Sequence, residues 1–326
     1  MRHAWGMKVA ITGASGLIGS ALVPHLRARG DEVLRLVRRP AVAPDEVSWD
    51  PTAGTVDLEA LAGIDAVVHL AGAGVGDHRW TDDYKKTILD SRVDGTHTIV
   101  QAMTALDPTP RTLVAGSAIG WYGETGDRVV DEQTPAGSGF LADVVRAWEA
   151  AADPAAEAGI RVTHARTGLV VSAPDSTVGP LLSILKVSLG GTSGGAGGAF
   201  GPLIPSVRLN LAGRLGSGQQ YWSWISLRDE VAALTYLLDT EAISGPVNLT
   251  GPNPVTNATV AHTLGRLIGR PVLPPIPAFA IRALLGEFSI EVLGSTRVVP
   301  SALEASGFDF QDTTIESAIR TALEGS

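Results

Sequence analysis

The sequence predicts an α/β fold built on a doubly wound parallel sheet, followed by a small C-terminal domain. Short apolar, β-branched runs alternate with helical patterns along the first half of the chain, which is typical of βαβ units. The apolar runs are nearly continuous, as expected for strands that helices cover on both faces. A glycine-rich turn, GASGLIG, lies between the first such run and the first helical pattern.

The first half of the chain supplies most of the expected sheet. KVAIT (Lys8–Thr12) is the first strand, and the helix after it ends at Gly30. The further strands are expected at Glu32–Arg38, Asp65–Gly72, Arg111–Ser117 and Arg161–Gly168, and helices at Thr81–Leu106 and Leu141–Glu157.

The regularity weakens in the second half. The glycine-rich stretch Ser188–Pro205 is interpreted as a solvated loop, or alternatively as a lid over a cleft. A helix is expected after Asp229, a strand at Pro246–Gly251, and a small helical tail after the proline-rich stretch that begins at Arg270. We therefore expect one domain at residues 1–170 plus about 225–250, and a smaller one at 171–224 and 251–326.

Composition excludes several classes of function. The 326 residues are 44% hydrophobic and 18% charged, with a formal net charge of −9 and no long basic run, so nucleic acid and anionic membrane surfaces are not expected partners. Cysteine is absent, which excludes disulfides and thiolate chemistry. We expect a cytoplasmic protein without a membrane span, and leave open whether it is a monomer or a homodimer.

The turn after the first strand has the spacing of a dinucleotide-binding loop. Gly13, Gly16 and Gly19 form G-x-x-G-x-x-G directly after a strand and at the start of a helix. The first glycine allows a tight turn, the second lets the backbone approach a pyrophosphate, and the third lets helix and strand pack closely. The helix N-terminus would then bind the phosphates, as in a Rossmann-type sheet.

The end of the second strand indicates which dinucleotide binds. An NAD site usually places an acid there to hold the ribose hydroxyls, whereas this strand ends in Arg38 and Arg39. Two guanidinium groups favour a 2′-phosphate. The expected cofactor is NADP(H), although both arginines could merely be solvated at a surface corner.

These residues resemble the extended short-chain dehydrogenase/reductase superfamily, and within it an atypical, sugar-nucleotide epimerase-like branch with its own C-terminal domain. The motifs that carry the resemblance are TGASGLIG, HLAG, SRVDGT, SAIGWYG and, for the branch itself, GSGQQYWSWISLRDEVAALTYLL and GRPVLPPIPAFAIRALLGE to ALEASGF. The resemblance implies a pyrophosphate site at the backbone of Ala14, Ser15, Leu17 and Ile18, an adenine site at Asp57 and Leu58, a ribose site at Leu70, Ala71 and Gly72, and a nicotinamide site at Thr167, Gly168 and Leu169.

The catalytic pair of that superfamily, a tyrosine and a lysine four residues apart, is absent from this sequence. The expected positions carry Leu141 and Val145, and no tyrosine of the chain has a lysine four residues later. The remaining candidates are Tyr122 as a proton donor, Arg92 as the positive charge beside it, and Ser117. The alternative is that Tyr122 packs at a cleft wall with its hydroxyl satisfied by the protein.

Other side chains give weaker signals. Trp121, Trp222 and Glu124 are candidate contacts of a small-molecule substrate, although both tryptophans could equally be buried core. His78 lies in no ligand cluster, so no metal is expected. Together these features predict an oxidoreductase or epimerase that acts on a nucleotide-sugar or similar polar metabolite. The alternative is a non-catalytic protein that senses NADPH.

Overall fold

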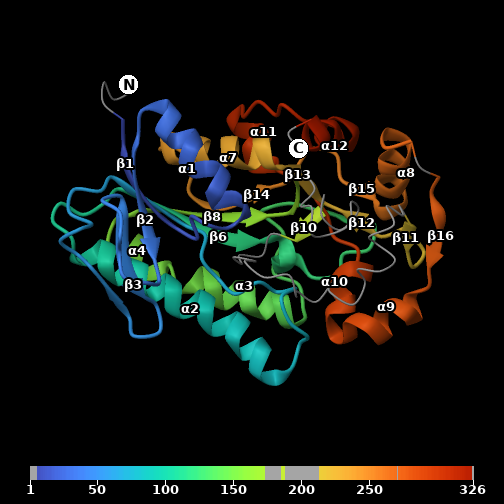
Figure 1. Cartoon of the computed structure of the whole chain (residues 1–326), viewed down its shortest axis with the longest axis horizontal. Coiled ribbons are helices and arrows are strands. Elements are labelled where there is room, and N and C mark those ends of the chain that lie inside the picture. The colour runs from blue at the N-terminus through green and yellow to red at the C-terminus, as the bar shows by residue number, and fades with distance from the viewer. Residues whose placement is uncertain (1–5, 173–184, 188–212, 270, 325–326) are drawn as a thin grey trace.

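A sheet of eight strands forms the centre of the computed structural model, which describes residues 6–172, 185–187, 213–269 and 271–324 (Figure 1). Seven strands run parallel, and the edge strand β4 runs antiparallel to its neighbour. In spatial order the strands are β14 (Gly245–Leu249), β8 (Arg161–Thr167), β6 (Thr112–Ala118), β5 (Ala66–His69), β1 (Lys8–Thr12), β2 (Glu32–Val37), β3 (Glu46–Asp50) and β4 (Thr55–Val56).

The order of the strands confirms the doubly wound sheet. From β1 the chain proceeds outward through β2 and β3 on one side, and then returns to the other side of β1 to build β5, β6 and β8. The direction of winding therefore reverses between β1 and β5. In sheets of this class, ligands bind outside the carboxyl ends of the strands at such a point.

Helices cover both faces of the sheet (Figure 1). One face packs against α1 (Leu17–Arg29), α7 (Leu227–Asp239) and α11 (Ser301–Ser306), and the other against α2 (Asp82–Ala105), α3 (Phe140–Ala150) and α4 (Asp153–Glu157). Side chains alternate between the two cores, as the two-residue period of a strand requires: Val9 and Ile11 face the α1 side, and Ala10 the α2 side.

The ends of the helices follow local sequence signals. Gly30 closes α1 in the left-handed conformation with φ 98°, and the Thr81 side chain accepts a hydrogen bond from the Tyr84 amide at the start of α2. The prediction of one helix over Leu141–Glu157 is wrong, since the chain forms two helices there. Pro154 lies in the first turn of α4, and because proline has no amide hydrogen it begins a helix more readily than it continues one.

The C-terminal half adds short strands and helices beside the sheet. Among them, β9 runs parallel to β13, and the helices α8, α9, α10 and α12 share a core with α3 that contains Trp224, Ile281 and Phe288. The elements not yet named are η1 (Ile119–Tyr122), β7 (Val129–Val130), β9 (Leu169–Val171), β10 (Leu185–Val187), β11 (Gly213–Leu215), β12 (Tyr221–Trp222), β13 (Trp224–Ser226), β15 (Val255–Thr256), α8 (Asn257–Leu267), β16 (Leu273–Ile276), α9 (Ala278–Leu285), η3 (Gly286–Phe288), α10 (Ser289–Leu293), β17 (Arg297–Val298) and α12 (Ile315–Glu324).

Two predictions from the sequence are not tested by these elements. The glycine-rich stretch Ser188–Pro205 lies outside the described residues. The division into two domains stays a prediction. Within the described part of the chain, no helix combines the length and the apolar character that a membrane crossing requires.

Candidate functional site

Two glycines where β1 leads into α1 leave no room for a side chain. Gly13 has φ 68°, and a Cβ atom there would lie 2.8 Å from the carbonyl carbon of Leu70. A Cβ atom at Gly19 would lie 2.3 Å from the carbonyl oxygen of Gly13. These contacts give Gly13 and Gly19 the turning and packing roles that their spacing predicts.

The N-terminus of α1 is open to an anion. Its N-cap, Gly16, has an extended backbone and no side chain to cap the helix, and no acidic residue lies in the first turn. The first amides of a helix have no intrahelical partner and form its positive end. Ala14, Ser15, Leu17 and Ile18 therefore surround a site that fits a pyrophosphate.

Thr12 joins this turn to the neighbouring segment after β5. The Thr12 hydroxyl accepts hydrogen bonds from the amides of Leu70 (3.0 Å) and Ala71 (3.1 Å) and lies 2.8 Å from Nδ1 of His69. Two accepted bonds fill both lone pairs of the hydroxyl, so its proton must point to Nδ1 of His69. Burial lowers the pKa of His69 to about 4, which keeps the ring neutral. The expected ribose segment, Leu70 to Gly72, is thus fixed beside Gly13.

An open pocket of about 460 Å³ lies beyond the carboxyl end of β2. It is lined by Arg38, Arg39, Pro40, Ser48, Trp49, Asp50, Thr55, Val56 and Asp57. Leu58, which follows Asp57, is 40% exposed. The structure therefore brings together the residues expected around the adenosine, namely the two arginines and Asp57.

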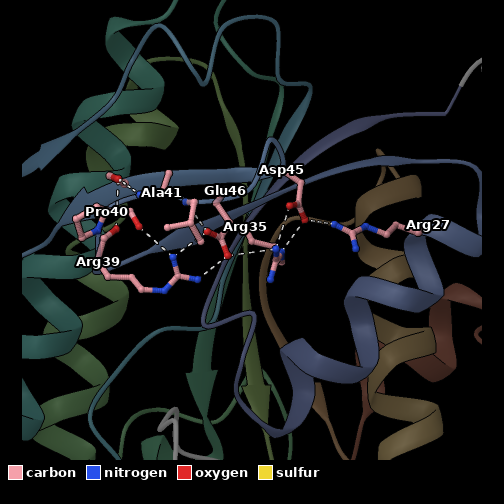
Figure 2. A network of polar contacts seen from close by, with 9 residues as sticks. Arg27, Arg35, Arg39, Pro40, Ala41, Asp45 and Glu46 are labelled. Atoms are coloured by element: carbon pink, nitrogen blue, oxygen red, sulfur yellow. Dashed lines mark hydrogen bonds and ion pairs between the residues drawn. The ribbon is translucent and has the colours of Figure 1, made fainter.

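The two arginines at this pocket differ in their contacts. Arg38 is exposed and forms no hydrogen bond or ion pair with any residue in the described ranges. Arg39 donates two hydrogen bonds to the Glu46 carboxylate, of 2.8 Å and 2.6 Å (Figure 2). These bonds from Arg39 lower the pKa of Glu46 to about 2.

The expected nicotinamide segment follows β8. A Cβ atom at Gly168 would lie 2.6 Å from the carbonyl oxygen of Ser223, so this position also requires glycine, and the next residue, Leu169, begins β9. The Thr167 hydroxyl donates a 2.8 Å hydrogen bond to Glu230 of α7. Burial raises the pKa of Glu230 to about 8, so this carboxyl group is largely protonated at neutral pH.

A buried polar network lies near the carboxyl ends of β6, β8 and β14. Ser117 donates a 2.6 Å hydrogen bond to Glu149, whose carboxylate also accepts two bonds of 2.8 Å from Arg166. Arg166 in turn donates to the Tyr122 hydroxyl (3.1 Å), which donates to Oδ1 of Asn248 (2.8 Å). The network connects β6, α3, β8, η1 and β14, and every one of its hydrogen bonds is buried.

Arg92 has a different neighbourhood from the one that the sequence predicts. It is 1% exposed, donates to the carbonyl oxygens of Ala73 and Ile88, and lies 5.0 Å from the ring centre of Trp148. The cation in contact with Tyr122 is Arg166. The expected pairing of Tyr122 with Arg92 therefore does not appear among these contacts.

The positions of the missing catalytic pair belong to the core. Leu141 and Val145 of α3 are 4% and 1% exposed, and their side chains pack against Gly120, where a Cβ atom would lie 3.3 Å and 3.7 Å from them. No polar side chain of α3 replaces the pair at these two positions. Glu149, one turn further along, is the polar group that this helix directs into the site.

The three expected substrate contacts lie in different environments. Trp121 is partly buried, donates to the carbonyl oxygen of Thr134, and has the guanidinium of Arg166 3.9 Å from its ring centre. Glu124 accepts hydrogen bonds from the amides of Gly126 and Ser295. Trp222 is 8% exposed in the core of the C-terminal half. No cluster of metal-ligating side chains exists among the described residues.

Sequence reasoning did not assign a role to Glu46, Arg166, Asn248 or Glu230. One of these left a signal in the sequence: Glu230 begins the apolar face of its helix, whereas the strand RVTHART around Arg166 is polar at five of its seven positions. The partners of Glu46 and Asn248 depend on tertiary contacts.

Comparisons with known proteins agree with this geometry. The model of the NAD dependent epimerase/dehydratase family matches residues 9–250, and a domain of unknown function (DUF1731) matches residues 276–322. Epimerase family protein Mb2239 of Mycobacterium bovis is 44% identical over 312 residues, which cover 95% of this chain and 96% of the relative. Epimerase family protein SDR39U1 of Mus musculus is 30% identical over 318 residues, covering 96% of this chain and 99% of the relative.

Solved structures of similar fold include further members of epimerase families. The human epimerase family protein SDR39U1, crystallised with NADPH, superposes with a TM-score of 0.80 at 29% identity and covers 98% of this chain and 100% of that chain. A nucleoside-diphosphate sugar epimerase from Corynebacterium glutamicum superposes with a TM-score of 0.73 at 32% identity and covers 98% of this chain. The present chain spans 58% of the Corynebacterium chain.

The family model covers most of the chain, and the curated relatives align along nearly all of it. The glycine turn after β1, the uncapped N-terminus of α1 and the order of the strands all fit an NAD(P)-binding sheet. The chain therefore belongs to the NAD dependent epimerase/dehydratase family, within the extended short-chain dehydrogenase/reductase superfamily, and carries the C-terminal domain of its epimerase-like branch.

Proposed function

We propose that the protein is an NADP(H)-binding oxidoreductase or epimerase that acts on a nucleotide-sugar or a similar polar metabolite. The observation that carries the cofactor assignment is the exposed Arg38 at the pocket beyond β2, which pairs with none of the described residues, where an NAD site usually places an acid. The NADPH in the human SDR39U1 structure supports this choice. The description of the Corynebacterium protein as a nucleoside-diphosphate sugar epimerase supports the substrate class.

We further propose Tyr122 as the proton donor of the reaction. Bound NADP(H) would supply the hydride, and the protein must then protonate an oxygen atom of the substrate. Burial raises the pKa of Tyr122 to about 12, an effect that Arg166 partly offsets, so the hydroxyl is protonated at neutral pH. For it to act, substrate must replace Asn248 as its hydrogen-bond acceptor. Ser117 and Arg92 would act as positioning residues, because both are buried and bonded to protein atoms.

The cofactor assignment is tested by titrating the protein with NADPH and NADH. We expect tighter binding of NADPH. In the Arg38→Ala variant the dissociation constant of NADPH should rise about 10–100-fold, and that of NADH should change less than about twofold, because a charge-assisted phosphate contact is lost. Equal affinities of the unchanged protein for the two cofactors would refute the NADP(H) assignment.

A non-catalytic NADPH sensor is the second candidate, and two observations favour it. Leu141 and Val145 leave no acid or base at the usual catalytic positions, and the Tyr122 hydroxyl has both a donor and an acceptor within the protein. A panel of nucleotide-sugars with NADPH separates the candidates through Tyr122→Phe. An enzyme loses turnover at least about 100-fold while NADPH still binds, whereas a sensor has no turnover with either protein.

A further inference from the structure

The turn between β2 and β3 carries both arginines of the adenosine pocket, and the roles assigned to them below rest on the proposed NADP(H) function. Arg38 and Arg39 are adjacent in sequence and have the same charge, so the sequence alone assigns them the same role. Their surroundings differ. Arg38 has no hydrogen bond or ion pair with any residue that the structure describes, whereas Arg39 is bound twice to one carboxylate.

Glu46 holds Arg39 from within the protein. Its side chain is only 3% exposed, although the Arg39 side chain is 53% exposed. Oε1 of Glu46 faces Nη2 of Arg39 at 2.6 Å and Nη2 of Arg35 at 3.3 Å. Oε2 accepts from Nη1 of Arg39 and from the Val42 amide at 3.0 Å. Both oxygens are therefore engaged, and this carboxylate is not available to a ribose hydroxyl.

The same contacts hold the backbone of the turn. Arg39 is linked to Glu46 near the two ends of the turn, and the Val42 amide binds the same carboxylate from its middle. Ser48 adds a second anchor, since its hydroxyl accepts from the Ala41 amide and donates to the carbonyl oxygen of Arg39. Figure 2 shows this arrangement, with Arg39 directed toward Glu46 at one end of the network.

The turn and the residues that pair with it carry more positive than negative side chains. Asp45 is paired with Arg27 and Arg35, and Glu46 with Arg35 and Arg39. Four arginines, Arg38 included, thus face two carboxylates. The other acids at the pocket, Asp50 and Asp57, accept hydrogen bonds from backbone amides of the turns that follow them. Arg38 is therefore the arginine of this group whose five donors are all free for a phosphate among the described residues.

We propose that Arg38 alone binds the adenosine 2′-phosphate, and that Arg39 is a positioning residue which Glu46 holds so that the turn keeps Arg38 at the pocket. Arg39 uses both N–H donors of its guanidinium group to bind Glu46. A lysine could not replace it, because lysine lacks two parallel N–H donors. Glu46 thereby becomes a determinant of cofactor preference without touching the cofactor.

The test compares the ratio of the NADH to the NADPH dissociation constant among four proteins: the unchanged chain, Arg38→Ala, Arg39→Ala and Glu46→Gln. Arg38→Ala should lower this ratio about 10–100-fold and reduce the dependence of NADPH binding on salt. Arg39→Ala should weaken both cofactors by a similar small factor, lower the midpoint of thermal unfolding, and leave the ratio within about twofold of its original value. Arg39→Lys should behave like Arg39→Ala, since a phosphate ligand would tolerate lysine but a fork would not.

Glu46→Gln distinguishes holding from competition. If Glu46 holds the turn, Glu46→Gln and Arg39→Ala lower the unfolding midpoint non-additively and neither improves NADPH binding. An increase in NADPH affinity above about threefold in Glu46→Gln would show that Arg39 had been withheld from the phosphate, and an Arg39→Ala ratio as low as that of Arg38→Ala would show that both arginines bind it. Either result overturns the division of roles and leaves the NADP(H) assignment intact. An unchanged chain that does not prefer NADPH overturns both.

Discussion

The two ends of the dinucleotide site are built in opposite ways. The adenosine and phosphate end consists of a glycine turn, an uncapped helix N-terminus and an exposed arginine, all at the ends of β1 and β2. The end at which a reaction is proposed, called the reaction end below, consists of a fully buried chain of hydrogen bonds from Ser117 to Asn248. One end therefore presents unpaired donors to solvent, and at the other the donors and acceptors satisfy each other.

The two ends differ in whether they must rearrange before they can meet a ligand. Backbone amides and the helix terminus bind an anion without rearrangement, because their geometry is fixed by the sheet. The Tyr122 hydroxyl must give up Asn248 before it can meet a substrate. The anion site is thus already formed in the unliganded fold, whereas the proposed proton donation by Tyr122 would require a change of hydrogen-bond partner.

The largest effect that tests this contrast is expected at the buried ion pair. Arg166→Met leaves the Glu149 carboxylate in the core without its cation, which should lower the free energy of unfolding by about 3–5 kcal/mol. Chemical denaturation measures the loss. The matched control is Arg166→Met combined with Glu149→Gln, which removes the uncompensated charge and should recover part of it. A single variant as stable as the original chain would mean that the network is hydrated and not closed.

The second effect is expected at the adenosine and phosphate end, in the turn after β1. Gly13→Ala requires a left-handed backbone and places a Cβ atom 2.8 Å from Leu70, which should cost about 2–4 kcal/mol and abolish measurable NADPH binding. Gly159→Ala is the control, because Gly159 has φ 82° but open space around its Cβ position. It should cost about 1–2 kcal/mol and leave NADPH binding unchanged. Equal loss of binding in both variants would mean that strain alone, and not the shape of the turn, governs the site.

The sequence predicted the adenosine and phosphate end of the site far better than the buried network from Ser117 to Asn248. Strands, the Gly13 turn and the end of α1 at Gly30 depend on local patterns that a single sequence displays. The splitting of Leu141–Glu157 into two helices depends on one proline in an otherwise helical pattern, and it was missed. The partners of Tyr122 come from β8 and β14, which lie 44 and 126 residues away along the chain. No local periodicity encodes contacts at that separation. The sequence therefore suggests Arg92, from the SRVDGT motif, as the cation beside Tyr122.

The third effect is a dependence of stability on pH that originates at Glu230, the buried carboxyl group that binds the Thr167 hydroxyl. Burial raises the pKa of its carboxyl group from the ordinary value of 4.5 to about 8 in the folded protein. Between these values the unfolded chain loses this proton and the folded protein keeps it, so stability falls as pH rises. The slope is about 1.4 kcal/mol per pH unit for one group, or about 2 kcal/mol from pH 6 to 7.5.

Glu230→Gln separates this group from all others. The amide oxygen can still accept from Thr167, and no charge develops in the core at high pH. Denaturation at several pH values should show similar stability of the two proteins near pH 5 and a more stable variant at pH 8. Parallel stability curves across this range would show that Glu230 reaches water and is ionised in the folded protein.

The smallest effect is expected at Ser117 and decides whether this residue belongs to the reaction or to the scaffold. Its hydroxyl is buried and directed at Glu149, which Arg166 still holds with two bonds after Ser117→Ala. The loss should therefore be about 1 kcal/mol of unfolding free energy, with the dissociation constant of NADPH unchanged within about twofold. Denaturation and NADPH titration together measure both quantities. If Ser117→Ala kept its stability but lost turnover of a nucleotide-sugar substrate by two orders of magnitude, the hydroxyl would have to leave Glu149 for the substrate. In that case the closed network would be a resting arrangement that opens at two points, Ser117 and Tyr122, rather than at Tyr122 alone.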